Sequence, residues 1–370
     1  MVINMNIEVE GYTKEQIKAA LFSSARKVRY EYTITNATGE HLGFAEVENG
    51  VISYDSTQEI MRSFSGRIKK SDLINMDCID YKLVPWMCLM MPNGKEAKFP
   101  LGSFYIVPSL QSELNINMVN IVGYDMGKIF SDDKADTRVF VDSTDVYTSI
   151  IAQFIGRRYM NFDVEESEYT KSFPQEWDIG TSYLTIINDL LRGINYDPLH
   201  FDENGKAICR EHVSVYERLI DFQYLADDMS IILDGITTSS DKFDTPNKWI
   251  RYTENVDAPY YISVVVNDDD KSPYSVQNRG RMIVDSAVVN DIASQQALDN
   301  YTNRIAAEAM QSTERIEFST LNMPGHDYRE CLYVKVPSYD IDGRYIEVAW
   351  EMELVSGGQM RHICEKVVRL

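Results

Sequence analysis

The stretch that decides the fold is Lys82–Ile106, KLVPWMCLMMPNGKEAKFPLGSFYI, in which two apolar runs flank the turn Pro92-Asn93-Gly94. Aromatic and β-branched residues favour strands, and Gly and Asn favour the turns between them. The most apolar part, Leu83–Pro92, is about half the length of roughly 20 residues that a membrane helix needs, and Pro flanks it. The stretch therefore predicts β-strands and not a membrane-spanning segment.

Similar strand-like runs lie on both sides of this stretch, between Val28 and about Phe130. They are RYEYTITN from Arg29, FAEVENGVISYD from Phe44, IDYKLVPWMCLMM from Ile79, FPLGSFYIVPSL from Phe99 and NMVNIVGYD from Asn117. Turn signals such as Thr38-Gly39 and Asn49-Gly50 separate some of these runs. Several short strands at near-regular spacing predict a barrel or sandwich, here over residues 28–139.

Residues 1–27, ahead of these strands, predict a helical arm. Thr13 and Gln16 have the spacing of a capping box, in which each side chain bonds to the backbone of the other residue. Ile17 and Leu21 then share one face of the helix, so this face is expected to be buried.

Residues 140–229 predict a mixed α/β insertion. Ser143 or Thr144 is expected to cap a first helix, and a second helix is expected to start near residues 181–182. The turn Asp202–Gly205 lies between two apolar runs, which predicts a β-hairpin.

Strand-like runs return after residue 230, and one helix, about 291–310, interrupts them. This order predicts a second β-barrel domain over 230–370 with an inserted helix. The predicted fold class is α+β, mainly β: two related β-barrel domains, a mixed α/β insertion and short helices.

The charge of the chain limits its partners. The 370 residues contain 36 Lys and Arg but 57 Asp and Glu, which gives a formal net charge of −21. Such a surface repels phosphate backbones and argues against a protein that binds nucleic acid by releasing counterions. A channel wall past which DNA slides without specific binding remains compatible with this charge.

The cysteines and the N-terminus point to a protein made in a reducing compartment. The five cysteines are odd in number and scattered, and none forms a CxxC pair, which predicts reduced thiols and neither disulfides nor a zinc site. They are Cys78, Cys88, Cys209, Cys331 and Cys364. The first residues have no basic start followed by an apolar run, so no secretion signal is expected.

No motif nominates a catalytic, cofactor or metal site, and we expect none. Phosphate-binding glycine loops and HExxH are absent, and Ser182 in Gly180-Thr181-Ser182 is better explained as a helix cap than as a nucleophile. Asp340–Gly343 is better explained as a hairpin turn than as a calcium loop, and Asp268–Asp270 as a solvated loop. The histidines lie in separate segments without ligand spacing and are expected at surface or half-buried positions. They are His41, His200, His212, His326 and His362.

Three groups of residues, taken in order along the chain, resemble the baseplate hub or tail-associated proteins of bacteriophage tails and phage-tail-like bacteriocins. The positions that carry the resemblance are Trp86, Gly102, Phe104 and Asp125, then Trp177, Gly180, Leu191, Asn195, Tyr196, Asp202 and Gly205, and finally Pro324. The chain departs from the family's pattern at Asp327–Cys331, which intervenes where the family often has an acid directly before the last strand.

The resemblance implies a structural protein of a contractile injection system or other tail, without enzymatic activity. Three copies would form a ring whose six barrels adapt the sixfold tail tube to the threefold spike. The implied partners are other copies of the chain, the tail tube protein or a distal tube-initiator ring, the spike, needle or tip protein, and the tape measure protein. The implied location is the baseplate or tail tip of the virion, after assembly in the host cytoplasm.

Two other functions remain open from the sequence. One is a virion-associated cell-wall hydrolase or a carbohydrate-binding protein of the tail tip. The other is a host β-protein of unrelated role. The 57 acidic residues do not single out a carboxylate pair for glycoside hydrolysis.

Overall fold

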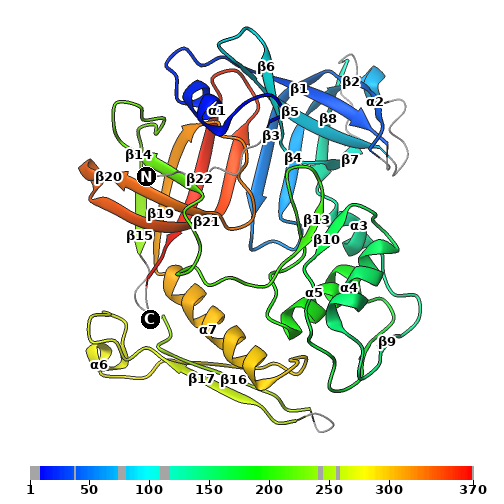
Figure 1. The fold of residues 1–370 in the computed structure, drawn as a ribbon, viewed down its shortest axis with the longest axis vertical. Helices are drawn as coiled ribbons and strands as arrows, with labels where there is room; N and C mark the ends of the chain where they lie inside the picture. The colour runs from blue at the N-terminus through cyan, green and yellow to red at the C-terminus, as the bar shows by residue number, and fades with distance from the viewer. Residues whose placement is uncertain are drawn as a thin grey trace.

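Most strands of the computed structural model belong to one 14-stranded sheet (Figure 1). The structure describes residues 9–36, 39–73, 81–108, 117–240, 245–255 and 259–368. The first half of the sheet contains β1 (Val28–Thr35), β2 (His41–Ala45), β3 (Val47–Asp55), β4 (Arg62–Lys69), β5 (Lys82–Met90), β6 (Glu96–Pro100), β7 (Phe104–Pro108) and β8 (Met118–Tyr124). The second half contains β14 (Phe222–Leu225), β15 (Thr237–Ser240), β19 (Glu314–Leu321), β20 (Cys331–Val336), β21 (Ile341–Glu353) and β22 (Gln359–Lys366).

Strand β21 joins the two halves. It has 13 residues, so it is long enough to pair with β20 and β22 in the second half and with β3 in the first. At the junction the rings of Tyr54 and Trp350 stack with their centroids 5.6 Å apart. Buried side chains of both halves, from Tyr32 to Cys364, belong to one hydrophobic core.

The mainly β prediction is confirmed, whereas two separate closed barrels are not observed. Among the described residues, the strand order runs from β15 at one end to β2 at the other, and these end strands do not pair. The physical reason is the β3–β21 pairing, which makes the two groups of strands continuous.

Two strands of the large sheet, β4 and β14, have no counterpart among the predicted strands, and the strand predicted at Ser230–Thr237 is not observed, because β15 begins only at Thr237. In β4 the inward Phe64 and Ile68 are separated by Ser65, Gly66 and Arg67, so the apolar alternation is too weak to predict a strand. Strand β14 has only four residues and pairs in parallel with β20, which lies more than 100 residues away in the chain.

The middle of the chain forms a mixed layer with its own core beside the large sheet. Its elements are α3 (Gly127–Asp132), β9 (Val139–Val141), α4 (Tyr147–Gly156), β10 (Phe162–Val164), β11 (Gln175–Trp177), α5 (Tyr183–Gly193), β12 (His200–Phe201) and β13 (Ala207–Cys209). Ser182 caps α5 by accepting a hydrogen bond from the Thr185 amide, and β12 and β13 form the predicted hairpin. The prediction that Ser143 or Thr144 caps α4 was wrong, because the cap position is Val146.

A second, smaller sheet lies at the lower end of the view in Figure 1, with one long helix over it. It consists of β16 (Lys248–Tyr252), β17 (Ile262–Val266) and β18 (Val284–Val288), and α6 (Val276–Arg279) lies in the connection before β18. The helix is α7 (Gln295–Gln311), close to the predicted 291–310. The strands of this sheet were expected within the second barrel, but among the described residues they pair only with one another.

Short helices complete the fold: α1 (Lys14–Leu21), α2 (Lys70–Leu73) and the 3-10 helix η1 (Pro337–Tyr339). The predicted capping box of Thr13 and Gln16 is confirmed, and Ile17 and Leu21 are buried. The hairpin between β20 and β21 turns at Pro337–Asp340, three residues earlier than the predicted Asp340–Gly343, because Ile341 already pairs with Val336 in the strands. No helix in the described part of the chain is long and apolar enough to cross a membrane.

Candidate functional site

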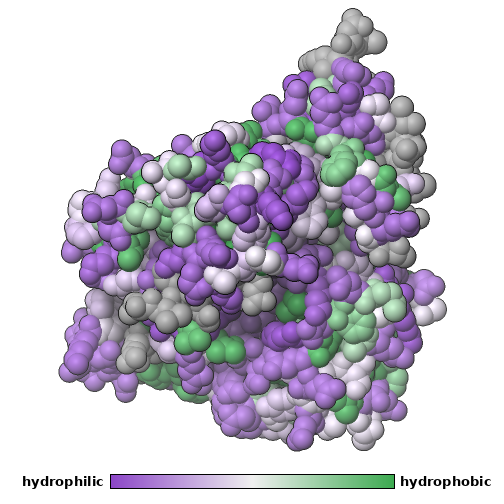
Figure 2. Space-filling model, turned by 45° about the horizontal axis from the view of Figure 1, so that its top comes forward, coloured by the Kyte–Doolittle hydropathy of each residue, from purple (hydrophilic) through white to green (hydrophobic). Residues whose placement is uncertain are grey.

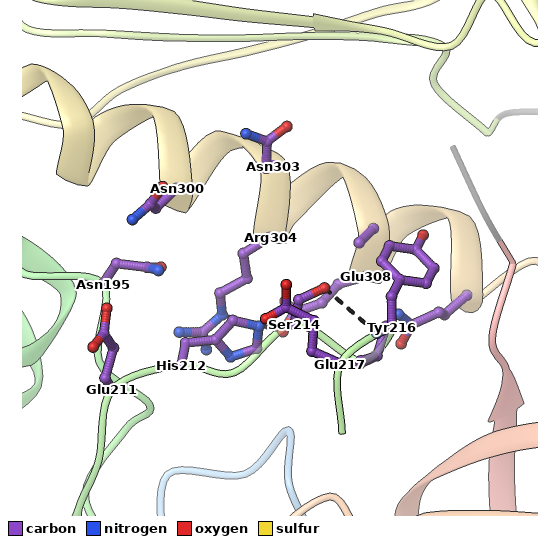
Figure 3. Close-up of a pocket in the computed structure, with 13 residues that line it drawn as sticks. Asn195, Glu211, His212, Ser214, Tyr216, Glu217, Asn300, Asn303, Arg304 and Glu308 are labelled. Carbon is purple, nitrogen blue, oxygen red and sulfur yellow. Dashed lines mark hydrogen bonds and ion pairs between the residues drawn. The ribbon is translucent and has the colours of Figure 1, made fainter. Parts of the chain in front are cut away.

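A polar cleft of about 650 Å³ lies where α7 faces the segment that follows β13 (Figure 3). Amide and charged side chains dominate its walls, so it is suited to polar contacts. The lining residues are Asn195, Glu211, His212, Ser214, Val215, Tyr216, Glu217, Asn300, Asn303, Arg304, Ala307, Glu308 and Gln311.

Arg304 connects α7 to the floor of this cleft. Its side chain extends from the helix toward His212 in Figure 3 and donates a hydrogen bond to the Tyr196 carbonyl at 3.0 Å. Its guanidinium also lies 3.2 Å from Glu308 and 3.5 Å from Asp197. Burial acts to lower the pKa of Arg304, but the neighbouring acids outweigh burial and raise it, so the side chain stays charged.

Asp197 and His212 form a second pair in the same place, with 2.8 Å between Oδ1 and Nδ1. Burial acts to raise the pKa of Asp197, but His212 and Arg304 stabilise its carboxylate, and the pKa is lowered overall. Asp197 is therefore an ionised acceptor held between Arg304 and His212.

Ser214 lines the cleft beside this pair, so a Ser-His-Asp arrangement has to be tested. Such an arrangement needs a hydrogen bond between the hydroxyl and the imidazole. Ser214 Oγ instead accepts the Tyr216 amide at 3.4 Å, and no bond joins it to His212 in the described structure. The cleft thus has the contacts of a joint between α7 and the mixed layer.

A separate buried cluster lies inside the second half of the large sheet. The carboxylate of Glu347 accepts from His326 Nδ1 and His362 Nδ1, each at 2.5 Å. The outer nitrogens of the two rings pair with Tyr224 Oη and Thr320 Oγ1, each at 2.8 Å. The side chains of Glu347 and both histidines are fully buried, so every polar contact is within the protein.

The electrostatics of the cluster keep Glu347 charged. Burial acts to raise its pKa, but the two histidines outweigh burial and lower the pKa to about 2. For His362, burial is the largest effect and lowers the pKa below its usual value. The cluster therefore holds a carboxylate between two imidazole donors.

His326, Glu347 and His362 are also residue types that bind metals, and their ligand atoms lie within 4.8 Å of one another. Each Nδ1, however, already donates to a Glu347 oxygen, and each Nε2 has a hydroxyl partner. A metal ion would have to displace both Nδ1 hydrogens. The arrangement fits a complete hydrogen-bond network better than a metal centre.

The sequence-based placement of three histidines, His200, His326 and His362, was wrong, and His200 is only 8% exposed. His326 and His362 are fully buried, not at the surface or half-buried. A signal for His362 exists: it lies between the apolar Met360 and Cys364 at spacing two, which places all three on the inward face of β22. No comparable signal marks Asp197 or Arg304, because their contacts join residues far apart in the chain.

The motif positions of the first half of the large sheet hold strands and turns together. Trp86 Nε1 donates to Thr33 Oγ1 at 2.9 Å. Asp125 accepts the amides of Arg62 at 2.9 Å and Gly127 at 2.8 Å, and burial raises its pKa to about 6. Gly102 has φ +123° and lies against the Phe104 ring, where a Cβ would come within 2.9 Å of a ring carbon.

The remaining motif positions lie mostly in the mixed layer. Trp177 Nε1 donates to Asp189 at 2.9 Å, and Asp202 accepts the amides of Asn204 and Lys206 in its hairpin turn. Backbone turns with positive φ occur at Gly180, Asn195 and Gly205, while Leu191, Tyr196 and Pro324 are buried. Of all twelve motif positions, Asn195 is the one that lines the cleft.

Four of the five cysteines lie in the described residues, and all four are buried free thiols: Cys88, Cys209, Cys331 and Cys364. Cys78 lies outside the described residues. The predicted solvated loop at Asp268–Asp270 is a loop in the structure.

Comparison with known proteins shows that this fold is similar to that of tail proteins. No protein-family model matches the chain, and no curated protein matches its sequence. Among solved structures, a tail protein from Neisseria meningitidis is similar, with TM-score 0.65 and 11% identity over 91% of this chain and 97% of that one. The 43 kDa tail protein of prophage MuSo2 from Shewanella oneidensis has a TM-score of 0.60 and 11% identity, over 92% of this chain and 98% of that one. Prophage tail protein gp18 from Listeria monocytogenes has a TM-score of 0.55 and 13% identity, over 90% of this chain and 94% of that one.

These likenesses extend over nearly the whole of both chains in each comparison. At identities of 11–13% they show the fold, and the chain therefore has the fold of phage tail proteins.

Proposed function

We propose that the chain is a structural protein of a phage or phage-like tail and that it works as a trimeric hub. The observation that carries this proposal is the likeness of its fold, along 91% of its length, to a tail protein. In this role the chain needs no reaction, because its work is to bind other subunits in a fixed geometry.

The shape of the large sheet supports a ring of three copies. The sheet has two halves joined by β21, so three chains would present six groups of strands around one axis. Its end strands, β2 and β15, have one side without a strand partner among the described residues, and such edges are usually covered. A closed ring of heterologous contacts covers edges without forming open fibres.

The proposed partners follow from the place of a hub in the tail. They are the tail tube protein or a tube-initiator ring above, the spike or tip protein below, and the tape measure protein. We further propose that acidic surface faces the channel, so that DNA passes without specific binding. The proposed domains are residues 1–27, 28–139, 140–229 and 230–370, with the motif positions acting as structural residues.

The competing function is a wall hydrolase that would use the polar cleft. Its supporting observation is the Asp197–His212 pair, 2.8 Å apart, near Ser214. A base without a hydrogen-bonded nucleophile is an incomplete catalytic arrangement, so we favour the structural role.

Light scattering on the purified full chain, together with zymography on bacterial cell wall, tests the proposal. We expect a mass three times that of the 42.5 kDa chain and no clearing of the wall. A lytic monomer whose activity is lost in His212→Gln would establish the hydrolase and contradict the hub. A monomer without lysis would also contradict the hub.

A further inference from the structure

The small sheet of β16, β17 and β18 has two faces of different character. Its inner face packs on α7: Trp249 of β16 is fully buried in one cluster with Ala306 and Met310 of the helix. Val265 of β17 packs against the same cluster. The helix therefore covers one side of the sheet, and no helix or strand of the described residues lies over the other side in Figure 1.

The outer face of the sheet is apolar. The strand pairing places three rows of side chains on it, because residues paired across strands point to the same face. The rows are Val266, Lys248 and Val284; Val264, Ile250 and Ser286; and Ile262, Tyr252 and Val288. Seven of these nine residues are apolar or aromatic, and we call this set the outer face.

The outer face is also exposed to solvent. The exposed fractions are 47% for Ile262, 49% for Val264, 38% for Val266, 50% for Val284 and 41% for Val288. An antiparallel or mixed sheet with one solvated face normally carries polar residues there. Elsewhere the surface is different: the face in Figure 2 is mostly hydrophilic, with hydrophobic residues in small scattered groups. Contiguous apolar patches of this kind mark interaction surfaces.

The size of the outer face fits part of a protein contact. Three strands about 4.8 Å apart and five residues long span roughly 14 by 17 Å. This is about 240 Å², compared with about 800 Å² that each partner buries in a stable complex. The face is thus suited to be the apolar centre of a larger contact, surrounded by more polar residues.

The distribution of charge favours a second copy of this chain as the occupant. Two copies with a charge of −21 repel each other, and the repulsion is weakest where each copy is locally neutral. Residues 245–290, which contain the small sheet, have five Lys and Arg against six Asp and Glu, so the rest of the chain carries almost all of the excess. Within the outer face itself, Lys248 is the single charged residue.

We propose that the outer face of the β16–β17–β18 sheet is buried between two copies of this chain. The inference rests on the proposed self-assembly and assigns it a specific contact. Val264 lies in the middle row, on β17 beside Ile250 of the central strand β16, and is 49% exposed, so a charge placed there enters the contact without entering the packed side of the sheet.

Sedimentation equilibrium of the full chain tests the contact. Val264→Asp should weaken self-association by about 30-fold or more, because it buries an unpaired carboxylate within the contact. Val264→Thr keeps the branched shape and the preference for a strand, so it should weaken association less and guards against misfolding of the Asp variant. Phe140→Asp is the matched control: Phe140 is 61% exposed, but it lies in β9, outside the small sheet.

The possible results separate the two proposals. The contact would be supported if the wild type and Phe140→Asp are trimeric while Val264→Asp is largely monomeric. In that case Val264→Asp should unfold at a temperature similar to that of the wild type. An equally trimeric Val264→Asp would overturn the contact and leave the hub intact. A monomeric wild type would overturn both the contact and the hub. A monomer that binds lipid vesicles through this face would do the same. A wild-type dimer broken by Val264→Asp supports the contact and contradicts the trimer.

Discussion

The half of the large sheet formed by β1–β8 is centred on aromatic rings, whereas the half with β19–β22 buries two imidazoles and a carboxylate. In the first half, the rings of Phe64 and Phe104 lie 5.5 Å apart. In the second, His326 and His362 flank Glu347, and the Phe318 ring stacks on His362 at 4.7 Å. Both arrangements fill the space between strands of one continuous sheet.

The difference teaches that the two halves are sensitive to different changes. An aromatic core depends on volume, so an added methyl group is expected to destabilise it, whereas the rings of Phe64 and Phe104 do not titrate. A buried polar network depends on complete pairing and on the charge of its members. Each of the following experiments addresses one side of this comparison.

The largest effect is expected from Glu347→Ala, which removes the acceptor shared by both imidazoles. Breaking a buried ionic network in this way costs about 3–5 kcal/mol of the free energy of unfolding. Urea denaturation measures the change. The control is Glu351→Ala, an exposed glutamate on the same strand, which should change stability by no more than about 0.5 kcal/mol. Equal losses in the two variants would show that the network contributes nothing special.

A smaller loss is expected from Gly123→Ala in the aromatic half. The new Cβ would lie 2.9 Å from Ile106 Cδ1 and 3.0 Å from Phe104 Cβ, so overpacking should cost about 1–3 kcal/mol. Gly343→Ala in the other half is the matched control, because its Cβ meets only the Tyr345 ring, at 3.8 Å. If thermal and urea unfolding show the same stability for both variants, tight packing is not what distinguishes the first half.

The smallest effect concerns pH. Because His362 has a lowered pKa in the folded state, its imidazole binds a proton near pH 6.5 in the unfolded chain but not in the folded chain. Stability should therefore fall as pH decreases from 7 to 5, by at most about 1.4 kcal/mol per pH unit for this one group. Glu347, with a folded pKa of about 2, adds a further loss as pH falls below about 4.5.

The comparison for this pH effect is His362→Asn, whose amide can still donate to Glu347 but does not titrate. Urea denaturation at several pH values should give a shallower dependence between pH 7 and 5 for the variant than for the wild type. An unchanged dependence would assign the effect to other groups.

Local signals in the sequence predicted local structure well. The capping box at Thr13 and the Ser182 cap are confirmed because each depends on residues three positions apart. The mainly β fold follows from alternating apolar residues, but the weak alternation of β4 concealed that strand.

Features made by distant residues could not be predicted in the same way. The network needs His326, Glu347 and His362 to meet from a loop and two strands, and nothing in their spacing of 15 to 21 residues indicates this. The cleft likewise depends on Arg304 reaching the carbonyl of Tyr196, 108 residues away. The pairing of β3 with β21, which joins the two predicted groups of strands in one sheet, connects residues about 300 positions apart.

A cryo-electron microscopy reconstruction of the assembled full chain tests the central claim most directly. Our account predicts a closed ring of three copies, with six groups of strands around a central channel and the small sheet of one copy against its neighbour. A ring of six identical chains, or particles no larger than one chain, would contradict it.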